Sequence, residues 1–304
     1  MTVNLGYACI NTHLQEKGVR CNYSMIKRTF QKRGIDYASE LSLKNVNGLK
    51  KIVEWNNSKN ISVYRMTSCL FPWSSEYSLS QLRDYPKIAK ILKEMGTIAS
   101  KAGQRLSFHP GQFCVLASKK SQVVENAARE LNTHAEIMDL MGLSQTPYNK
   151  INIHVGGAYG EHKQALERFC ENATGYLTKS ALSRLTVEND DKPNCFSTKM
   201  LYEGVYKTIG IPIVFDSHHF ELGPQDLDYH DSFYLARSTW GDVKQICHHS
   251  NSRKAFEDPK APKVSHSNWF YHPFKNFGEP VDVVLECKQK EAALFKYLDD
   301  FVSS

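Results

Sequence analysis

The chain has 304 residues, 41% of them hydrophobic and 23% charged, and a formal net charge of +6 at pH 7. This composition is typical of a globular protein with a sizeable core, and it excludes disordered and collagen-like chains. The N-terminus lacks the basic region and apolar core of a signal peptide, and no window approaches the roughly 18 apolar residues of a membrane span. We therefore expect a soluble protein that is not exported.

Short β-rich segments alternate along the chain with longer segments of helical periodicity. The eight expected strands cover residues 3–9, 61–66, 105–109, 150–155, 184–189, 211–216, 261–266 and 281–287. The clearest helices cover residues 84–103 and 121–142, where apolar residues recur at spacings of three and four and a glycine stands near the end. The polar, histidine-rich stretch 217–262 predicts one helix and a long loop.

Eight strands alternating with helices indicate an α/β fold, a (β/α)₈ (TIM) barrel, with a doubly wound open sheet as the competing architecture. Neither G-x-G-x-x-G after the first strand nor G-x-x-x-x-G-K-[ST] occurs, so the usual nucleotide-binding motifs of an open sheet are missing. No Gly/Ser/Pro-rich linker divides the chain, which favours a single domain over residues 1–304.

Six of the expected strands end at or near a residue that commonly binds metal ions: His109, His154, Glu188, Asp216, His266 and Glu286. In a (β/α)₈ barrel the C-terminal strand ends converge, so these side chains would lie close together. Imidazoles with bridging carboxylates suit a cluster of borderline divalent cations. Any one of these residues alone is more often a core histidine or a salt-bridge partner, but six similar strand ends together favour the metal cluster.

Five motifs, HPGQF, HVGGAYGEH, VEND, FDSHH and LECKQKE, follow the third, fourth, fifth, sixth and eighth strands, and LGYACIN opens the chain. Together they resemble the ultraviolet-damage endonuclease family over nearly the whole chain. The resemblance implies a barrel akin to the abasic-site endonucleases with two or three divalent ions, usually manganese. It also implies cleavage of the phosphodiester immediately 5′ of a pyrimidine dimer, a 6-4 photoproduct or an abasic site, leaving a 3′-hydroxyl and a 5′-phosphate.

The resemblance also implies how the ligands are divided among the ions. His109, His154 and Glu188 would hold one ion, and Glu188, as the bridging and catalytic carboxylate, would hold a second ion with Asp216, His266 and Glu286. His219 and His272 would belong to a third ion. Lys263 stands one position away from the family's strand-seven lysine, so we treat it as solvated. His218 is expected to be a neighbour, and the other histidines surface or packing residues: His13, His134, His162, His230, His248 and His249.

Further residues are candidates for contact with DNA. Gln112 and Phe113 follow His109 on a Pro-Gly turn and would fill the gap left when both nucleotides of a dimer leave the stack. Tyr7 and Asn11 match the family's positions on the other side of that gap. Lys288, beside the last ligand, is a candidate catalytic residue facing the phosphate, and Lys119 and Lys120 are candidate backbone contacts.

Three alternatives stay open: a sugar isomerase of the same barrel type, a plain abasic-site endonuclease and a non-enzymatic DNA-binding module. The preferred partner is duplex DNA containing ultraviolet lesions, with no membrane and with the protein as a monomer. The eight cysteines are scattered without a CxxC pair, which favours a reducing compartment. We therefore expect the cytoplasm or nucleoid, or the nucleus of a eukaryote.

Overall fold

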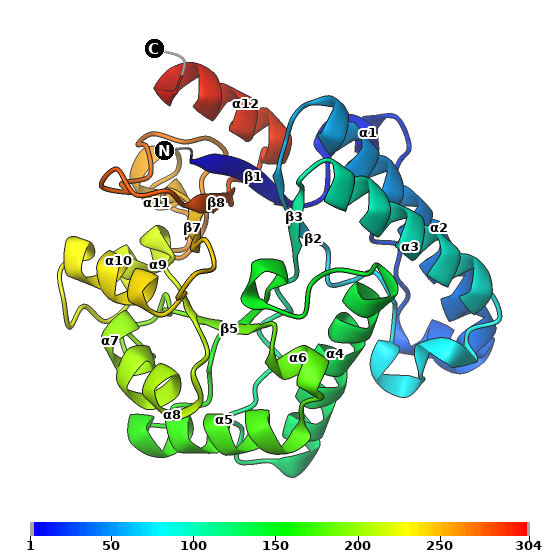
Figure 1. Ribbon diagram of the computed structural model, residues 1–304, viewed down its shortest axis with the longest axis horizontal. Coiled ribbons are helices and arrows are strands. Elements are labelled where there is room, and N and C mark those ends of the chain that lie inside the picture. Colours follow the sequence, from blue (N-terminus) through cyan, green and yellow to red (C-terminus); the bar gives the residue numbers. More distant parts are fainter. Residues whose placement is uncertain (1–2, 303–304) are drawn as a thin grey trace.

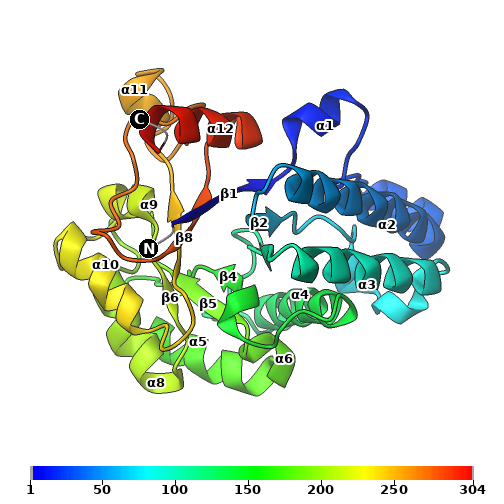
Figure 2. The same ribbon diagram turned by 45° about the horizontal axis from the view of Figure 1, so that its top comes forward.

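The computed structural model describes residues 3–302, in which short parallel strands are surrounded by helices (Figures 1 and 2). The eight strands within these residues are β1 (Asn4–Cys9), β2 (Val63–Met66), β3 (Arg105–Ser107), β4 (Ile151–Ile153), β5 (Leu185–Glu188), β6 (Ile213–Val214), β7 (Ile246–His249) and β8 (Asp282–Leu285).

These strands form a closed ring. The hydrogen-bonded orders are β3-β2-β1-β8-β7 and β4-β5-β6. Two isolated parallel bridges join the two sheets, Phe108 with Ile151 next to β3 and β4, and Asp216 with His248 next to β6 and β7. Because β1 also pairs with β8, every strand has its sequence neighbours on both sides. The expected (β/α)₈ barrel is confirmed, and the open-sheet alternative is wrong.

Helices cover the outside of the barrel (Figure 2). Their apolar faces recur at spacings of three and four, as in Ile88, Leu92 and Met95, which are fully buried. The α-helices are α1 (Thr12–Glu16), α2 (Lys27–Ser58), α3 (Tyr85–Lys101), α4 (Ser121–Leu140), α5 (His162–Tyr176), α6 (Lys179–Leu182), α7 (Thr198–Leu201), α8 (Lys207–Ile209), α9 (Ser217–Leu222), α10 (Tyr229–Ser238), α11 (Arg253–Phe256) and α12 (Lys290–Phe301).

The seventh strand differs from its prediction. It is β7, Ile246–His249, whereas residues 261–266 form no strand and lie in the connection that leads to β8. The stretch 217–262 contains α9, α10, β7 and α11 in place of one helix and a long loop. In β7 only Ile246 and Cys247 are apolar, and the last two residues are histidines. The pattern of apolar residues that marks a buried strand is therefore too short to predict β7.

The connections after β3 and β4 pack against each other at the C-terminal end of the barrel. Gly156 and Gly157 have φ angles of 59° and 62°, which glycine adopts without strain. A Cβ atom on Gly156 would lie 3.2 Å from Val115 Cγ1, and one on Gly157 would lie 3.1 Å from the carbonyl oxygen of Ala117. This close approach holds the segment that follows His109 beside the segment that follows His154.

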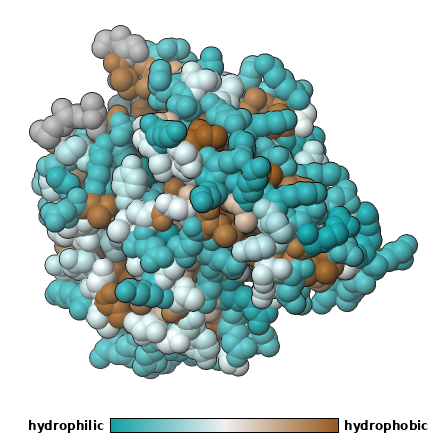
Figure 3. All heavy atoms as spheres, turned by 45° about the vertical axis from the view of Figure 1, so that its right-hand side comes forward, coloured by the Kyte–Doolittle hydropathy of each residue, from teal (hydrophilic) through white to brown (hydrophobic). Residues whose placement is uncertain are grey.

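Figure 3 shows one face of the molecule, on which hydrophilic residues predominate and hydrophobic residues form small separate patches. Among the helices of residues 3–302, none combines the length and apolar character needed to cross a bilayer.

Candidate metal centre

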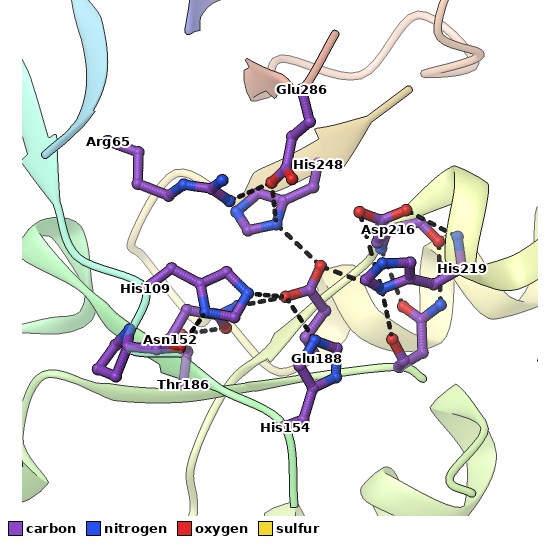
Figure 4. A network of polar contacts seen from close by, with 12 residues as sticks. Arg65, His109, Asn152, His154, Thr186, Glu188, Asp216, His219, His248 and Glu286 are labelled. Atoms are coloured by element: carbon purple, nitrogen blue, oxygen red, sulfur yellow. Dashed lines mark hydrogen bonds and ion pairs between the residues drawn. The ribbon is translucent and has the colours of Figure 1, made fainter. Parts of the chain in front are cut away.

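Glu188, the last residue of β5, is fully buried and lies at the centre of a ring of histidines (Figure 4). Its Oε2 atom lies 2.9 Å from His109 Nε2 and 3.8 Å from His154 Nε2. Its Oε1 atom lies 2.8 Å from His248 Nδ1 and 3.5 Å from His219 Nδ1. Each oxygen of this carboxylate therefore faces two imidazoles, which is suitable for a ligand shared between two cations.

Two further carboxylates lie at the same end of the barrel. Glu286, which follows β8, has its Oε1 atom 3.1 Å from His248 Nδ1. Asp216 caps α9, because its Oδ1 atom accepts hydrogen bonds from the backbone N–H groups of His218 (2.7 Å) and His219 (2.8 Å). Its Oδ2 atom is buried without a hydrogen-bond partner. An unpaired buried carboxylate oxygen beside ligand-type residues is consistent with a cation site.

Among residues 3–302, three groups of three residues have ligand atoms that all lie within 4.8 Å of one another: an exposed one at the start of α10 (Asp228, His230 and Asp231) and two at the C-terminal end of the barrel. Of these two, one consists of His109, His154 and Glu188, and the other of Glu188, Asp216 and His248. They share Glu188, the residue predicted to bridge two ions, and its bridging role stays a prediction. Neutral imidazoles and carboxylates also form a donor set that divalent transition metals accept, and the residues therefore fit such a cluster.

Two effects shift the pKa values in the cluster: burial, and close contacts between carboxylates and imidazoles. Burial alone would raise the pKa of Glu188, but His248 and His109 hold it well below its ordinary value. Burial raises the pKa of Asp216 to about 7, with Glu188 and Glu286 adding to the rise. Burial lowers the pKa of His248 to about 3. A buried carboxyl group that resists ionisation beside other carboxylates gains from a nearby cation, which stabilises its charged form.

His248 is the principal residue that sequence reasoning missed. It was predicted to be a surface or packing residue, but the side chain is fully buried between the carboxylates of Glu188 and Glu286, a contact that this prediction did not foresee. It replaces His266 as the histidine of the seventh strand. Placing the strand at Ile246–His249 would have found it, since its position near the C-terminal end matches those of the other ligands.

The two remaining predicted histidine ligands lie farther from Glu188. The ring centroid of His266 is 6.5 Å from that of His219 and 5.3 Å from that of His218, and its Nδ1 atom is buried without a partner. His272 is exposed, and its ring packs edge-on against Phe256 at 5.2 Å. The structure therefore places His266 beside the cluster and does not bring His272 to it.

The predicted lysines are exposed. Lys288 is exposed two residues after Glu286, and its backbone N–H donates to the carbonyl oxygen of Ser267 at 3.0 Å. Lys263 is exposed in the connection before β8. Lys119 Nζ forms an ion pair with Glu161 at 3.1 Å. The catalytic role of Lys288 stays a prediction.

Gln112 and Phe113 lie on the connection after β3, as their sequence position requires. Both are exposed, and Phe113 is 84% exposed, an unusual value for a large aromatic side chain. A cavity of about 320 Å³ lies beside them, lined by Gln112, His154 and residues of the following connections such as Asp191 and Lys192. Gln112 and Phe113, the residues predicted to fill the gap in the DNA, therefore lie next to a cavity that is lined in part by the candidate metal ligand His154.

Tyr7 and Asn11 have a different setting, because both side chains are buried. The hydroxyl group of Tyr7 donates to Asn56 Oδ1 at 2.7 Å and accepts from Asn11 Nδ2 at 2.8 Å. Asn11 Oδ1 accepts from the backbone N–H of Leu14 and caps α1. Through these hydrogen bonds both residues stabilise the segment after β1 from the interior of the protein.

A second set of polar residues touches the ligands from within the barrel. Lys150 Nζ lies 2.9 Å from His248 Nε2, and burial lowers the pKa of Lys150 to about 7. Asn152 Nδ2 donates to Glu188 Oε2, and Arg65 Nη1 donates to Glu286 Oε1. Lys150, Asn152 and His154 alternate along one strand, so their side chains point to the same face. That period of two is the signal that could have identified Lys150 and Asn152.

Comparison with known proteins places the chain among ultraviolet-damage endonucleases. The model of the family described as UV-endonuclease UvdE matches residues 3–304. The chain is 33% identical over 304 residues to the UV-damage endonuclease of Schizosaccharomyces pombe, covering 96% of the chain and 49% of that protein. It is 32% identical over 269 residues to the UV DNA damage endonuclease of Nostoc sp., covering 84% of the chain and 77% of that protein. The chain thus spans about half the length of the yeast relative.

Among solved structures, the crystal structure of SacUVDE is similar to this chain with a TM-score of 0.84 and 29% sequence identity, covering 98% of this chain and 99% of the other. The 3-keto-D-glucoside 4-epimerase of E. coli has a TM-score of 0.53 at 9% identity, covering 98% of this chain and 97% of the other. The second likeness concerns the barrel fold alone.

Proposed function

The chain belongs to the UV-endonuclease UvdE family, and we propose that it is a metal-dependent endonuclease that cuts DNA at ultraviolet photoproducts. The proposed cut is at the phosphodiester immediately 5′ of a cyclobutane dimer, a 6-4 photoproduct or an abasic site, and it leaves a 3′-hydroxyl and a 5′-phosphate. The observation that supports this proposal most is the position of Glu188 between two groups of ligand-type residues.

The ligand assignment follows the contacts described above. We assign His109, His154 and Glu188 to one ion, and Glu188, Asp216, His248 and Glu286 to a second. His219 would belong to a third ion, and the ring of His266 lies with its centroid 6.5 Å from that of His219. Divalent ions held by these residues, manganese being the one we expect, would supply the Lewis acidity that phosphodiester hydrolysis by water requires.

The chain's own residues hold the ligands in place and contact the DNA. Seven side chains from separate strands and from α9 are held at fixed positions, buried in the case of Glu188, Asp216 and His248 and half-buried in the other four, so little reorganisation is required when a phosphate arrives. The net charge of +6 supports contact with the DNA backbone, for which Lys119, Lys120 and Lys288 remain the proposed residues. No covalent nucleophile is required, since water is the attacking group in hydrolysis.

Lesion recognition is assigned to the segment after His109. A dimer joins two adjacent bases, so both nucleotides have to leave the stack together. Phe113 can stack in the vacated space and Gln112 can form hydrogen bonds with the orphaned bases. The 320 Å³ cavity beside them lies between this segment and His154, so an extruded group there would be close to the metal centre.

Tyr7 and Asn11 are the proposed contacts on the other side of the gap. Their side chains are buried and bonded to each other, so contact with DNA requires the segment after β1 to open. We expect the protein to act as a monomer where cellular DNA is found.

A nicking assay on supercoiled plasmid tests the proposed function. With Mn²⁺, irradiated plasmid should be converted to the open circular form, whereas unirradiated plasmid and reactions with excess chelator should stay supercoiled. Nicking of abasic plasmid alone would indicate a plain abasic-site endonuclease. Binding without nicking would indicate a non-enzymatic DNA-binding module.

A further inference from the structure

Strand β8 and the residue after it provide two acids, and each acid pairs with an arginine on another strand. Asp282, the first residue of β8, has its Oδ2 atom 3.0 Å from Arg105 Nη1. Arg105 also donates to the backbone carbonyls of Tyr148 and Lys244, which precede β4 and β7 and mark the N-terminal end of the barrel. Glu286 pairs with Arg65 at the opposite end, among the ligands (Figure 4).

The Arg65 contact fixes the orientation of Glu286. Arg65 Nη1 donates to Glu286 Oε1, and His248 Nδ1 lies 3.1 Å from the same oxygen. The side chains of Arg65 and Glu286 are each only 11% exposed, so water competes little for this pair. Because both contacts use Oε1, the other oxygen, Oε2, is left to face a cation.

Asn152 performs the equivalent task for Glu188. Its Nδ2 atom donates to Glu188 Oε2, while its Oδ1 atom accepts a hydrogen bond from Thr186 Oγ1 at 2.8 Å. The ionised carboxylate only accepts hydrogen bonds, so the Nδ2 end of the amide faces it, and the threonine hydroxyl holds the Oδ1 end by donating to it. All three side chains are buried on the neighbouring strands β4 and β5. A buried amide held at both ends leaves the bridging carboxylate little freedom to rotate.

We propose that Arg65 and Asn152 are positioning residues that orient Glu286 and Glu188 for cations before any cation binds; this inference rests on the proposed function. Partners that orient metal ligands commonly contribute about 10- to 100-fold in metal affinity. A competing explanation for Arg65 is that the guanidinium only replaces an absent cation. The two explanations predict opposite changes in metal affinity. Removing a positioning residue would weaken metal binding, whereas removing a guanidinium that only replaces a cation would strengthen it by removing a like charge.

Calorimetric titration with Mn²⁺ alone, without DNA, tests this proposal independently of turnover. We expect Arg65→Gln and Asn152→Leu each to weaken Mn²⁺ binding by about 10- to 100-fold without changing the number of ions bound. Arg65→Lys keeps one charged donor and should lie between the wild type and Arg65→Gln. If Arg65→Gln does not fold, Arg65→Lys and Asn152→Leu provide the test.

Arg105→Gln is the matched control for Arg65, because it breaks a buried arginine pair with the same strand at the other end of the barrel. Asn45→Leu is the control for Asn152, since Asn45 is a buried amide that bonds to the backbone of Tyr23 and Leu70 outside the centre. Both controls should lower the thermal midpoint of unfolding and leave Mn²⁺ affinity unchanged.

Several results would overturn the proposal. Unchanged Mn²⁺ affinity in Arg65→Gln or Asn152→Leu would remove the positioning role of that residue, and tighter binding in Arg65→Gln would establish the stand-in explanation. An equal loss of affinity in Arg105→Gln would show that any disturbance of the barrel has the same effect. A wild-type protein that binds no Mn²⁺ would overturn the proposed function together with this inference, whereas the other results leave the function intact.

Discussion

Replacing Glu188 by glutamine should abolish most of the nicking activity while preserving the fold. The amide has nearly the same shape as the carboxylate, but it lacks the negative charge that two ions would share. Two unit charges about 4 Å apart interact by about 4 kcal/mol at an effective dielectric constant of about 20. A loss of this size corresponds to about 10³-fold in rate, and because divalent ions carry twice the charge used here, this figure is a lower bound.

Single-turnover nicking of irradiated plasmid with Mn²⁺ measures this effect, together with the metal content by elemental analysis. Glu130→Gln is a suitable control, because burial raises the pKa of Glu130 on α4, outside the metal centre. We expect the control to nick at the wild-type rate. A Glu188→Gln protein with full activity and normal metal content would refute the assignment of Glu188 as the bridging ligand.

Three further predictions concern recognition and stability. Replacing Gln112 and Phe113 together by alanine should reduce affinity for dimer-containing duplex by about 5- to 150-fold, because about 1–3 kcal/mol of base stacking is lost. The Mn²⁺ content should not change. An affinity equal to that of the wild type would show that these two side chains do not fill the gap in the DNA. Binding to damaged duplex should weaken steeply as salt rises, and a salt-independent affinity would contradict a DNA substrate. Burial lowers the pKa of His134 to about 4, so unfolding takes up a proton below a pH of about 6.5. The free energy of unfolding should therefore fall by about 3 kcal/mol as the pH decreases through this range, and His134→Gln should flatten that dependence in urea titrations; an equally steep profile would exclude His134 as its source.

Much of the fold could be predicted because most strands are apolar runs with clear boundaries. The runs that end at His109, His154 and Asp216 have this form, and all of them lead into the C-terminal end of the barrel. β7 could not be found in the same way, since two of its four residues are histidines. Strands that line a polar site carry polar side chains there and so depart from apolar periodicity. Because β7 was not predicted, His248 was not recognised as a residue of the site.

The candidate site could be predicted at the level of strand ends but not of side-chain partners. Strand position brings Glu188 to the C-terminal end of the barrel, whichever side chains surround it. The contacts of Arg65, Lys150 and Asn152 depend on which residues of neighbouring strands share a level inside the barrel, and that register is not visible in a single sequence. His272 was placed by motif likeness alone, and the long connection before β8 directs it elsewhere.

We propose that this chain uses a metal centre bridged by Glu188 to cut DNA next to a lesion. The most direct measurement is the cleavage of an end-labelled duplex that contains one thymine dimer at a known position, with Mn²⁺ and with chelator. We predict a single cut at the phosphodiester immediately 5′ of the dimer, a 3′-hydroxyl that a polymerase extends, and no product with chelator. Cleavage at other positions, equal cleavage of the undamaged duplex, or cleavage that persists in chelator would contradict the claim.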